Sequence, residues 1–270
     1  MVEMSKKYKI GTRRFALVNW IGLWTLYKKE VLRFLIVWAQ TIFSPLISSL
    51  LFLLVLSLAI GSDRGNVLGV SFITFLAPGL IAMQIIQQSF SHSSSSFMIG
   101  KIQGNIVDIL YAPLSPAEVV TSVTLAAVTR SVMIAFISII IFSFLIDIKI
   151  VNYFTLVIFT FLSSFILGAL GIIAGMWSEK FDHMATVTNF IIVPLSFLSG
   201  TFYTLDRLPT ALQSIGKLNP FFYMIDGFRY SFINQSDGSI TVGLIYLSIL
   251  SITIWFIAYL LYKKGYKLKS

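Results

Sequence analysis

Long runs of hydrophobic residues, separated by short polar segments, divide most of the chain into helices of membrane-spanning length. A run of about 20 apolar residues crosses a hydrocarbon core of about 30 Å as an α-helix. We predict six spans with these approximate bounds: 34–60, 67–90, 118–146, 151–177, 184–203 and 240–261. Pro45 and Pro194 lie inside the first and fifth spans, where proline bends a helix. The pattern predicts an all-α integral membrane protein, with residues 1–270 as a single transmembrane domain.

Composition and charge support a membrane location. The chain is 57% hydrophobic and 11% charged, about half the charged fraction of soluble domains. Most of the 20 Lys and Arg residues lie in residues 1–33, in residues 91–117 and at the C-terminal end, so we predict that these segments and both termini are cytoplasmic. The net charge of +9 thus reflects membrane orientation, not nucleic-acid binding. We expect a multi-pass cell-membrane protein, in the inner membrane if the cell has two.

The segment before the first span has its own amphipathic pattern. Basic residues crowd its end, and apolar and aromatic residues recur at helical spacing: Leu17, Trp20, Trp24, Tyr27 and Val31. Aromatic rings beside lysines suit the headgroup layer. We therefore predict a cytoplasmic tail and an interfacial helix within residues 1–33; the alternative is the lower end of the first span.

Residues 91–117 predict a cytoplasmic loop that carries a short helix. Ser115-Pro116-Ala117-Glu118 has the form of a capping box and marks the start of the third span. Upstream, Asn105 suits an N-cap and Asp108 a first helical turn. Ile106, Ile109 and Leu110 then fall on one helical face. An amphipathic helix held between two spans predicts contact with a protein outside the membrane.

Residues 204–239 predict two short outer helices that dip back into the membrane. Leu208-Pro209 opens the first, which Gly216 ends, and Asn219-Pro220 opens the second. The second helix is rich in aromatic residues and has an acid and a base spaced to pair within it. We expect an outer gate formed by Phe221, Phe222, Asp226, Phe228 and Arg229. The alternative is an aromatic belt that anchors the outer surface.

Several polar residues fall inside the predicted spans. Gln84, Gln87 and Gln88 form a stripe that either bonds helices together or lines a path for a hydrophilic solute. Arg130 lies deep in the third span, where an arginine faces a partner or a polar cavity. Asn189 marks a polar contact in the fifth span. Close helix packing is predicted by the fourth-span glycines Gly168, Gly171 and Gly175.

The residues give no sign of catalysis. There is no cysteine, and His92 and His183 lack metal-ligand spacing and read as isolated histidines of polar loops. Gly100-Lys101 lacks the upstream glycine and the following Ser or Thr of a phosphate-binding loop. We predict that the chain is not an enzyme by itself and binds no cofactor.

The sequence resembles the permeases of type-2 ABC exporters over nearly its whole length. The residues that carry the resemblance are Pro78-Gly79-Leu80, Ser95-Ser96-Phe97, Lys101, Ala112–Pro116, Pro194–Gly200, Leu208-Pro209, Leu218-Asn219-Pro220 and Asp226–Arg229. It is most similar to the subgroup with nodulation-factor and drug-type export permeases.

The resemblance implies six spans with an interfacial helix, a cytoplasmic coupling helix and outer helices. It implies a homodimer of permease subunits with two separate ATP-binding cassette subunits, which use ATP and Mg²⁺. The ATPase contact then falls on the coupling segment, with Lys101, Asn105, Ile106, Asp108, Ile109 and Leu110. Many relatives carry two successive acids where this chain has Val107-Asp108, so the charged part of that contact differs here.

The implied function is export of a lipid-linked glycan, a glycolipid or an amphipathic drug-like compound. An autonomous channel or an ion-coupled secondary transporter is the alternative. Such a carrier is expected to show internal repeats and charged mid-membrane sites. Only Arg130 fits that description.

Overall fold

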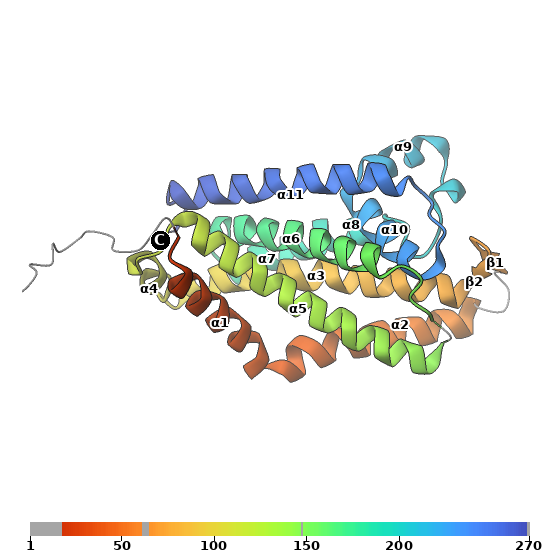
Figure 1. Cartoon of the computed structure of the whole chain (residues 1–270), viewed down its shortest axis with the longest axis horizontal. Coiled ribbons are helices and arrows are strands. Elements are labelled where there is room, and N and C mark those ends of the chain that lie inside the picture. The colour runs from red at the N-terminus through yellow and green to blue at the C-terminus, as the bar shows by residue number, and fades with distance from the viewer. Residues whose placement is uncertain (1–17, 61–64, 147, 269–270) are drawn as a thin grey trace, which may run out of the picture.

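The computed structural model describes residues 18–60, 65–146 and 148–268. The predicted basic tail and most of the predicted turn at residues 61–66 lie outside these ranges. Figure 1 shows an elongated bundle of long helices that run side by side. Those helices are α2 (Ser44–Ile60), α3 (Phe72–Ile102), α5 (Pro116–Leu145), α6 (Tyr153–Trp177) and α11 (Ile240–Lys263).

The fold is an all-α membrane fold, as predicted. Within the described residues, five helical segments are long and apolar enough to cross a membrane: Ala39–Ala59, α3, α5, α6 and α11. The count of six spans stays a prediction. We call one end of the bundle the α4 end, because it carries α4 (Ile106–Tyr111) and the C-terminal residues. The opposite end carries β1 (Asn66–Val67), β2 (Val70–Ser71) and α9 (Thr210–Leu218), and we call it the α9 end.

Helix α3 is the centre of the bundle and packs against α5, α6 and α10 (Pro220–Ile233). Its approach to α6 depends on glycine, as predicted. A Cβ atom at Gly171 would lie 2.5 Å from the Phe90 carbonyl oxygen, and one at Gly175 would lie 2.7 Å from that of Ser94. Any larger residue would push the two backbones apart.

The second span differs from the prediction at both ends. It begins at Phe72, because residues 66–71 form a two-stranded antiparallel hairpin whose turn places Leu68 and Gly69 at positive φ. It continues to Ile102, well past the expected end near Phe90. The serine-rich stretch is helical, and several of its hydroxyls donate to the helix's own carbonyls, as Ser94 Oγ does to Phe90 O at 2.7 Å.

Two prolines coincide with π-helical turns. α1 (Trp20–Ile36) runs past the expected end at Arg33, and η1 (Ala39–Phe43) follows it just before Pro45. The predicted fifth span is α7 (Phe181–Val187), η2 (Thr188–Ile192) and α8 (Val193–Phe197), which stops short of Tyr203. Its π-turn η2 likewise precedes Pro194. Proline lacks the N–H that bonds the carbonyl four residues earlier, so a wider turn accommodates it.

Local capping signals were largely correct. Ser115 and Glu118 form the predicted capping box at the start of α5. Asn219 Oδ1 accepts from Phe221 N at 3.1 Å and starts α10. Two details were wrong. Gly216 lies within α9, which follows η3 (Leu205–Arg207). Asn105 makes no capping bond, and its backbone is already helical, whereas a capping residue has non-helical dihedral angles.

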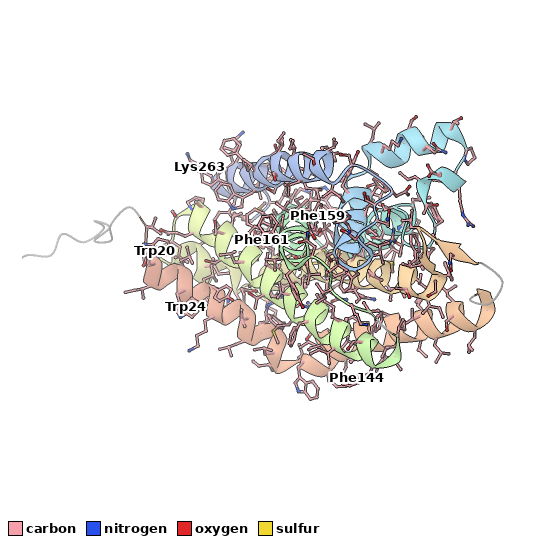
Figure 2. All side chains as sticks on the ribbon, turned by 45° about the vertical axis from the view of Figure 1, so that its right-hand side comes forward. Trp20, Trp24, Phe144, Phe159, Phe161 and Lys263 are labelled. Atoms are coloured by element: carbon pink, nitrogen blue, oxygen red, sulfur yellow. The ribbon has the colours of Figure 1, made fainter. Side chains whose placement is uncertain are left out.

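Helix α1 lies obliquely to the long helices and packs on α5 (Figure 1). Trp20 and Trp24 project outward from it and are exposed (Figure 2), whereas Leu26, Glu30 and Phe34 are buried. This orientation is the one expected of an interfacial helix, whose position in a membrane stays a prediction.

Candidate functional site

A polar groove lies between the α1–η1–α2 segment and helices α3 and α5, with a volume of about 760 Å³. We define the polar groove by its hydrogen-bonding side chains: Arg33, Gln40, Thr41, Ser44, Ser48, Gln84, Gln87, Gln88, Ser91, Ser95, Gln103 and Arg130. The groove therefore brings together four of the five polar residues that the sequence placed inside the spans, as a substrate path or as intramembrane polar contacts. The fifth, Asn189, is exposed on η2 and does not line the groove.

Arg130 anchors one wall of the polar groove from the middle of α5, with only 6% of its surface exposed. Its Nη2 atom donates to Gln88 Oε1, and to Thr41 O at 3.4 Å. The Thr41 carbonyl lacks its usual helical donor, because the residue four positions later is Pro45. Arg130 thus has both features expected of it, a polar cavity and structural partners.

A buried ionic cluster beside the groove was missed from the sequence. Glu30 Oε2 accepts from Arg33 Nε at 2.9 Å and from Ser96 Oγ at 2.8 Å. His92 Nε2 lies 3.8 Å from the same oxygen and is completely buried, so it is not the loop histidine that we expected. The available signal was Glu30 itself, the single acid between residues 16 and 60, three positions before an arginine.

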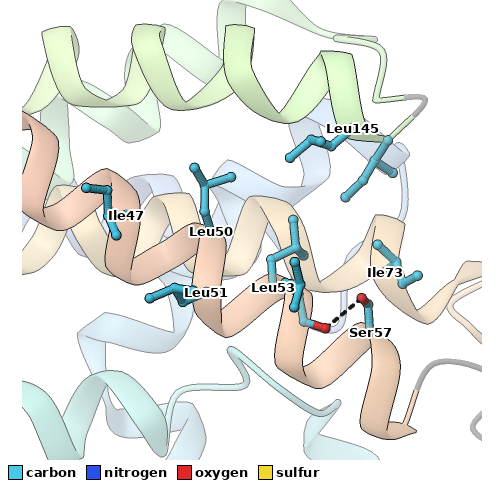
Figure 3. Close-up of a pocket in the computed structure, with 9 residues that line it drawn as sticks. Ile47, Leu50, Leu51, Leu53, Ser57, Ile73 and Leu145 are labelled. Carbon is cyan, nitrogen blue, oxygen red and sulfur yellow. Dashed lines mark hydrogen bonds between the residues drawn. The ribbon is translucent and has the colours of Figure 1, made fainter.

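A second hollow, of about 470 Å³, lies toward the α9 end between α2 and α5. Figure 3 shows aliphatic side chains of α2 and α5 projecting into the space between these helices. We define this apolar hollow by its lining residues: Ile47, Leu50, Leu51, Leu53, Leu54, Ser57, Ile73, Leu145 and Ile146. Ser57 Oγ donates to Leu54 O at 2.9 Å, which leaves the lining essentially apolar. The two spaces meet along α2: Ile47 lines the apolar hollow, and the next residue, Ser48, lines the polar groove.

Helix α4, the predicted coupling helix, turns its predicted apolar face partly inward. Ile106 is buried in a cluster with Leu26 and Phe97, and Ile109 is half-buried. Asp108 and Leu110 of the predicted contact set are exposed on α4, together with Val107 and Tyr111. Only part of the predicted contact set is therefore free to meet a partner.

The side chain of Lys101 bonds to the end of α6 within the same chain. Its Nζ atom donates to the carbonyls of Met176, at 2.7 Å, and of Ser178, where α6 ends. A cation here satisfies carbonyls that have no helical partner and complements the negative end of the helix dipole. Nearby, the exposed Glu179 and Lys267 pair at 2.8 Å, which lowers the pKa of the Glu179 carboxyl and raises that of the Lys267 amine.

The predicted gate residues are all buried inside the chain. Phe221, Phe222 and Phe228 pack in the core, where α10 meets α3, α6 and α11. In this conformation the three rings contact other helices of the same chain and are not exposed. A gate formed with a second copy stays a prediction, and so does the aromatic belt.

Asp226 and Arg229 each bind a loop and do not form the predicted pair. The Asp226 carboxylate accepts from Asp237 N and Gly238 N, both at 2.9 Å. Arg229 Nη2 donates to Gly200 O at 2.7 Å, and its guanidinium lies 3.9 Å from the centre of the Phe75 ring. The two side chains connect the interior of α10 to the segments at residues 237–238 and 200.

No group of three or more His, Asp or Glu side chains suited to a metal ion occurs in the described ranges.

The model for the ABC-2 type transporter family matches residues 22–233. The chain belongs to this family. Across 251 residues, it is 30% identical to the inner membrane transport permease YadH of Escherichia coli K12, covering 93% of this chain and 98% of that protein.

A second ABC-2 relative is nodulation protein J of Rhizobium leguminosarum bv. viciae, which is 25% identical over 229 residues. The match covers 81% of this chain and 83% of that protein. ABC-2 permeases are non-catalytic transmembrane subunits that lie in a membrane and work with an ATP-binding cassette partner. The chain is accordingly a multi-pass membrane permease of this family.

Proposed function

We propose that this chain is the permease subunit of an ATP-driven exporter. The substrate is a lipid-linked glycan, a glycolipid or an amphipathic drug-like compound. The polar groove carries the proposal, because it places four hydrophilic residues of the spans, Gln84, Gln87, Gln88 and Arg130, along one hollow beside an apolar one. A polar wall next to an apolar wall suits a molecule with a polar head and an apolar tail.

ATP and Mg²⁺ are used by a separate ATPase that docks at the α4 end. That end is cytoplasmic in this proposal, as are both termini. The exposed apolar side chains of Val107, Leu110 and Tyr111 support the docking site. Leu110→Glu is expected to reduce co-purification of the ATPase, whereas Tyr153→Glu, at the α9 end, is expected to leave it unchanged. Equal co-purification of both variants would contradict the assignment.

The transport path is completed by a second copy of the chain. Support comes from the exposed apolar surfaces of α2 and η2, including Leu51 and Phe190, which a symmetric partner can cover. Leu51→Cys and Phe190→Cys are expected to yield cross-linked dimers in membranes, with Ile252→Cys on α11 as the control. The absence of native cysteine leaves no background. If neither Leu51→Cys nor Phe190→Cys gives cross-linked dimers, in protein shown to be active, the homodimer is refuted.

Reconstitution with a candidate ATP-binding cassette ATPase tests the function directly. We expect ATP hydrolysis to rise with candidate glycolipids or amphiphiles, and substrate to cross the vesicle membrane only in the presence of ATP. Flux through the permease alone, without the ATPase, would instead indicate an autonomous channel or an ion-coupled transporter.

A further inference from the structure

The polar groove contains a positive charge that no carboxylate of the described residues neutralises. Arg33 is paired with Glu30 at 2.9 Å. For Arg130, by contrast, the residues with defined positions supply only the Gln88 amide oxygen and the Thr41 carbonyl, and no carboxylate. A charged side chain removed from water is costly unless a counter-charge faces it.

Donors without acceptors gather at the same place. Arg130 Nε and Gln87 Nε2 are both buried, and neither has a hydrogen-bond partner in the described part of the chain. Gln88 holds one edge of the Arg130 guanidinium, so its orientation is fixed before any ligand arrives. Unsatisfied buried donors are rare in proteins, and they call for an acceptor that the fold does not supply.

We propose that the polar groove binds the phosphate or carboxylate group of an amphipathic substrate, with Arg130 as its direct ligand. A planar guanidinium offers several donors in a fixed fork, which matches two oxygens of one anionic group. Gln87 adds a further donor from α3. The anion supplies the negative charge that Arg130 lacks among the described residues.

The apolar hollow favours an amphiphile over a free anion. It borders the same helix, α2, and Ile47 of the hollow directly precedes Ser48 of the groove. An alkyl chain attached to the bound anionic group therefore has an apolar space within reach. This inference names the substrate class of the proposed exporter and rests on that function only for the direction of transport.

Binding to the purified chain in nanodiscs of zwitterionic lipid tests the proposal without ATP or an ATPase. Hexadecyl phosphate is expected to bind at least about 10-fold more tightly than hexadecylphosphocholine, a difference of about 1.4 kcal/mol. Arg130→Gln should remove this preference, and Arg207→Gln, at an exposed position, should retain it. Equal affinity for the two head groups, or an unchanged preference in Arg130→Gln, would overturn the proposal.

A second measurement keeps the test valid if Arg130→Gln does not fold. Hexadecyl phosphate should slow thiol labelling of Ser91→Cys in the groove and leave Ser214→Cys, on the exposed side of α9, unaffected. Equal labelling of Ser91→Cys with and without the ligand would refute the site. Competition by inorganic phosphate shows whether the site also takes free anions. If inorganic phosphate displaces hexadecyl phosphate, the site binds free anions as well. If it does not, the site is restricted to amphiphiles. Because no transport is measured, failed ATP-driven export would leave this result standing.

Discussion

Replacing Gly171 with alanine tests the close contact between α6 and α3. The added Cβ would lie 2.5 Å from the Phe90 carbonyl oxygen, 3.0 Å from Ser93 Cβ and 3.1 Å from Ser94 N. Two of these three atoms are backbone, so no side-chain rotation relieves the overlap. One helix must move relative to the other.

The magnitude follows from two opposing terms. Overpacking of a tight core costs about 1–3 kcal/mol. Alanine in place of glycine in a helix interior returns about 0.5–1 kcal/mol, because the unfolded chain loses less conformational freedom on folding. The middle of each range gives a net loss of about 1 kcal/mol. At about 2–4 °C per kcal/mol for a chain of this size, the unfolding midpoint falls by about 2–4 °C.

Thermal unfolding of the purified protein in detergent provides the assay, and Gly100→Ala provides the matched control. Gly100 is also helical, but its added Cβ would lie 3.8 Å from the nearest atoms, which belong to Ile106. We expect the midpoint of this control to stay constant or to rise. A midpoint for Gly171→Ala at or above that of the wild type would show that α3 and α6 are not held this closely.

Three further substitutions test single contacts by the same assay. Lys101→Met should lower stability by about 1.5–3 kcal/mol, because charge-assisted bonds at a helix end are lost, whereas the exposed Lys180→Met should be neutral. Asn219→Ala removes a helix cap and should cost about 1–2 kcal/mol, with the exposed Ser214→Ala as control. Glu30→Ala should cost about 1–3 kcal/mol through lost bonds to charged and polar partners. An unfolding midpoint equal to that of the wild type would show that the corresponding contact does not stabilise the fold.

The sequence by itself determined the features that depend on neighbouring residues or on overall polarity. Apolar runs of sufficient length specified a membrane bundle, because backbone groups in lipid must bond within a helix. The capping box at Ser115 and the start of α10 at Asn219 were readable, since each cap bonds residues only two or three positions away. The glycines of α6 predicted that another helix packs closely against it, although the sequence did not show which helix.

The tertiary structure decided every feature whose partner is distant in sequence. Glu30 meets Ser96 and Lys101 meets Met176, across separations of 66 and 75 residues that no local pattern encodes. The aromatic residues of α10 looked like surface because the helix follows a proline-marked outer segment, yet packing against α3 and α6 buries them. The glutamine stripe on α3 was compatible with helix packing and with a solute path. Only the placement of η1 and α5 against it turned these polar residues into the wall of a groove, because a cavity exists only where separate helices fail to fill the space between them.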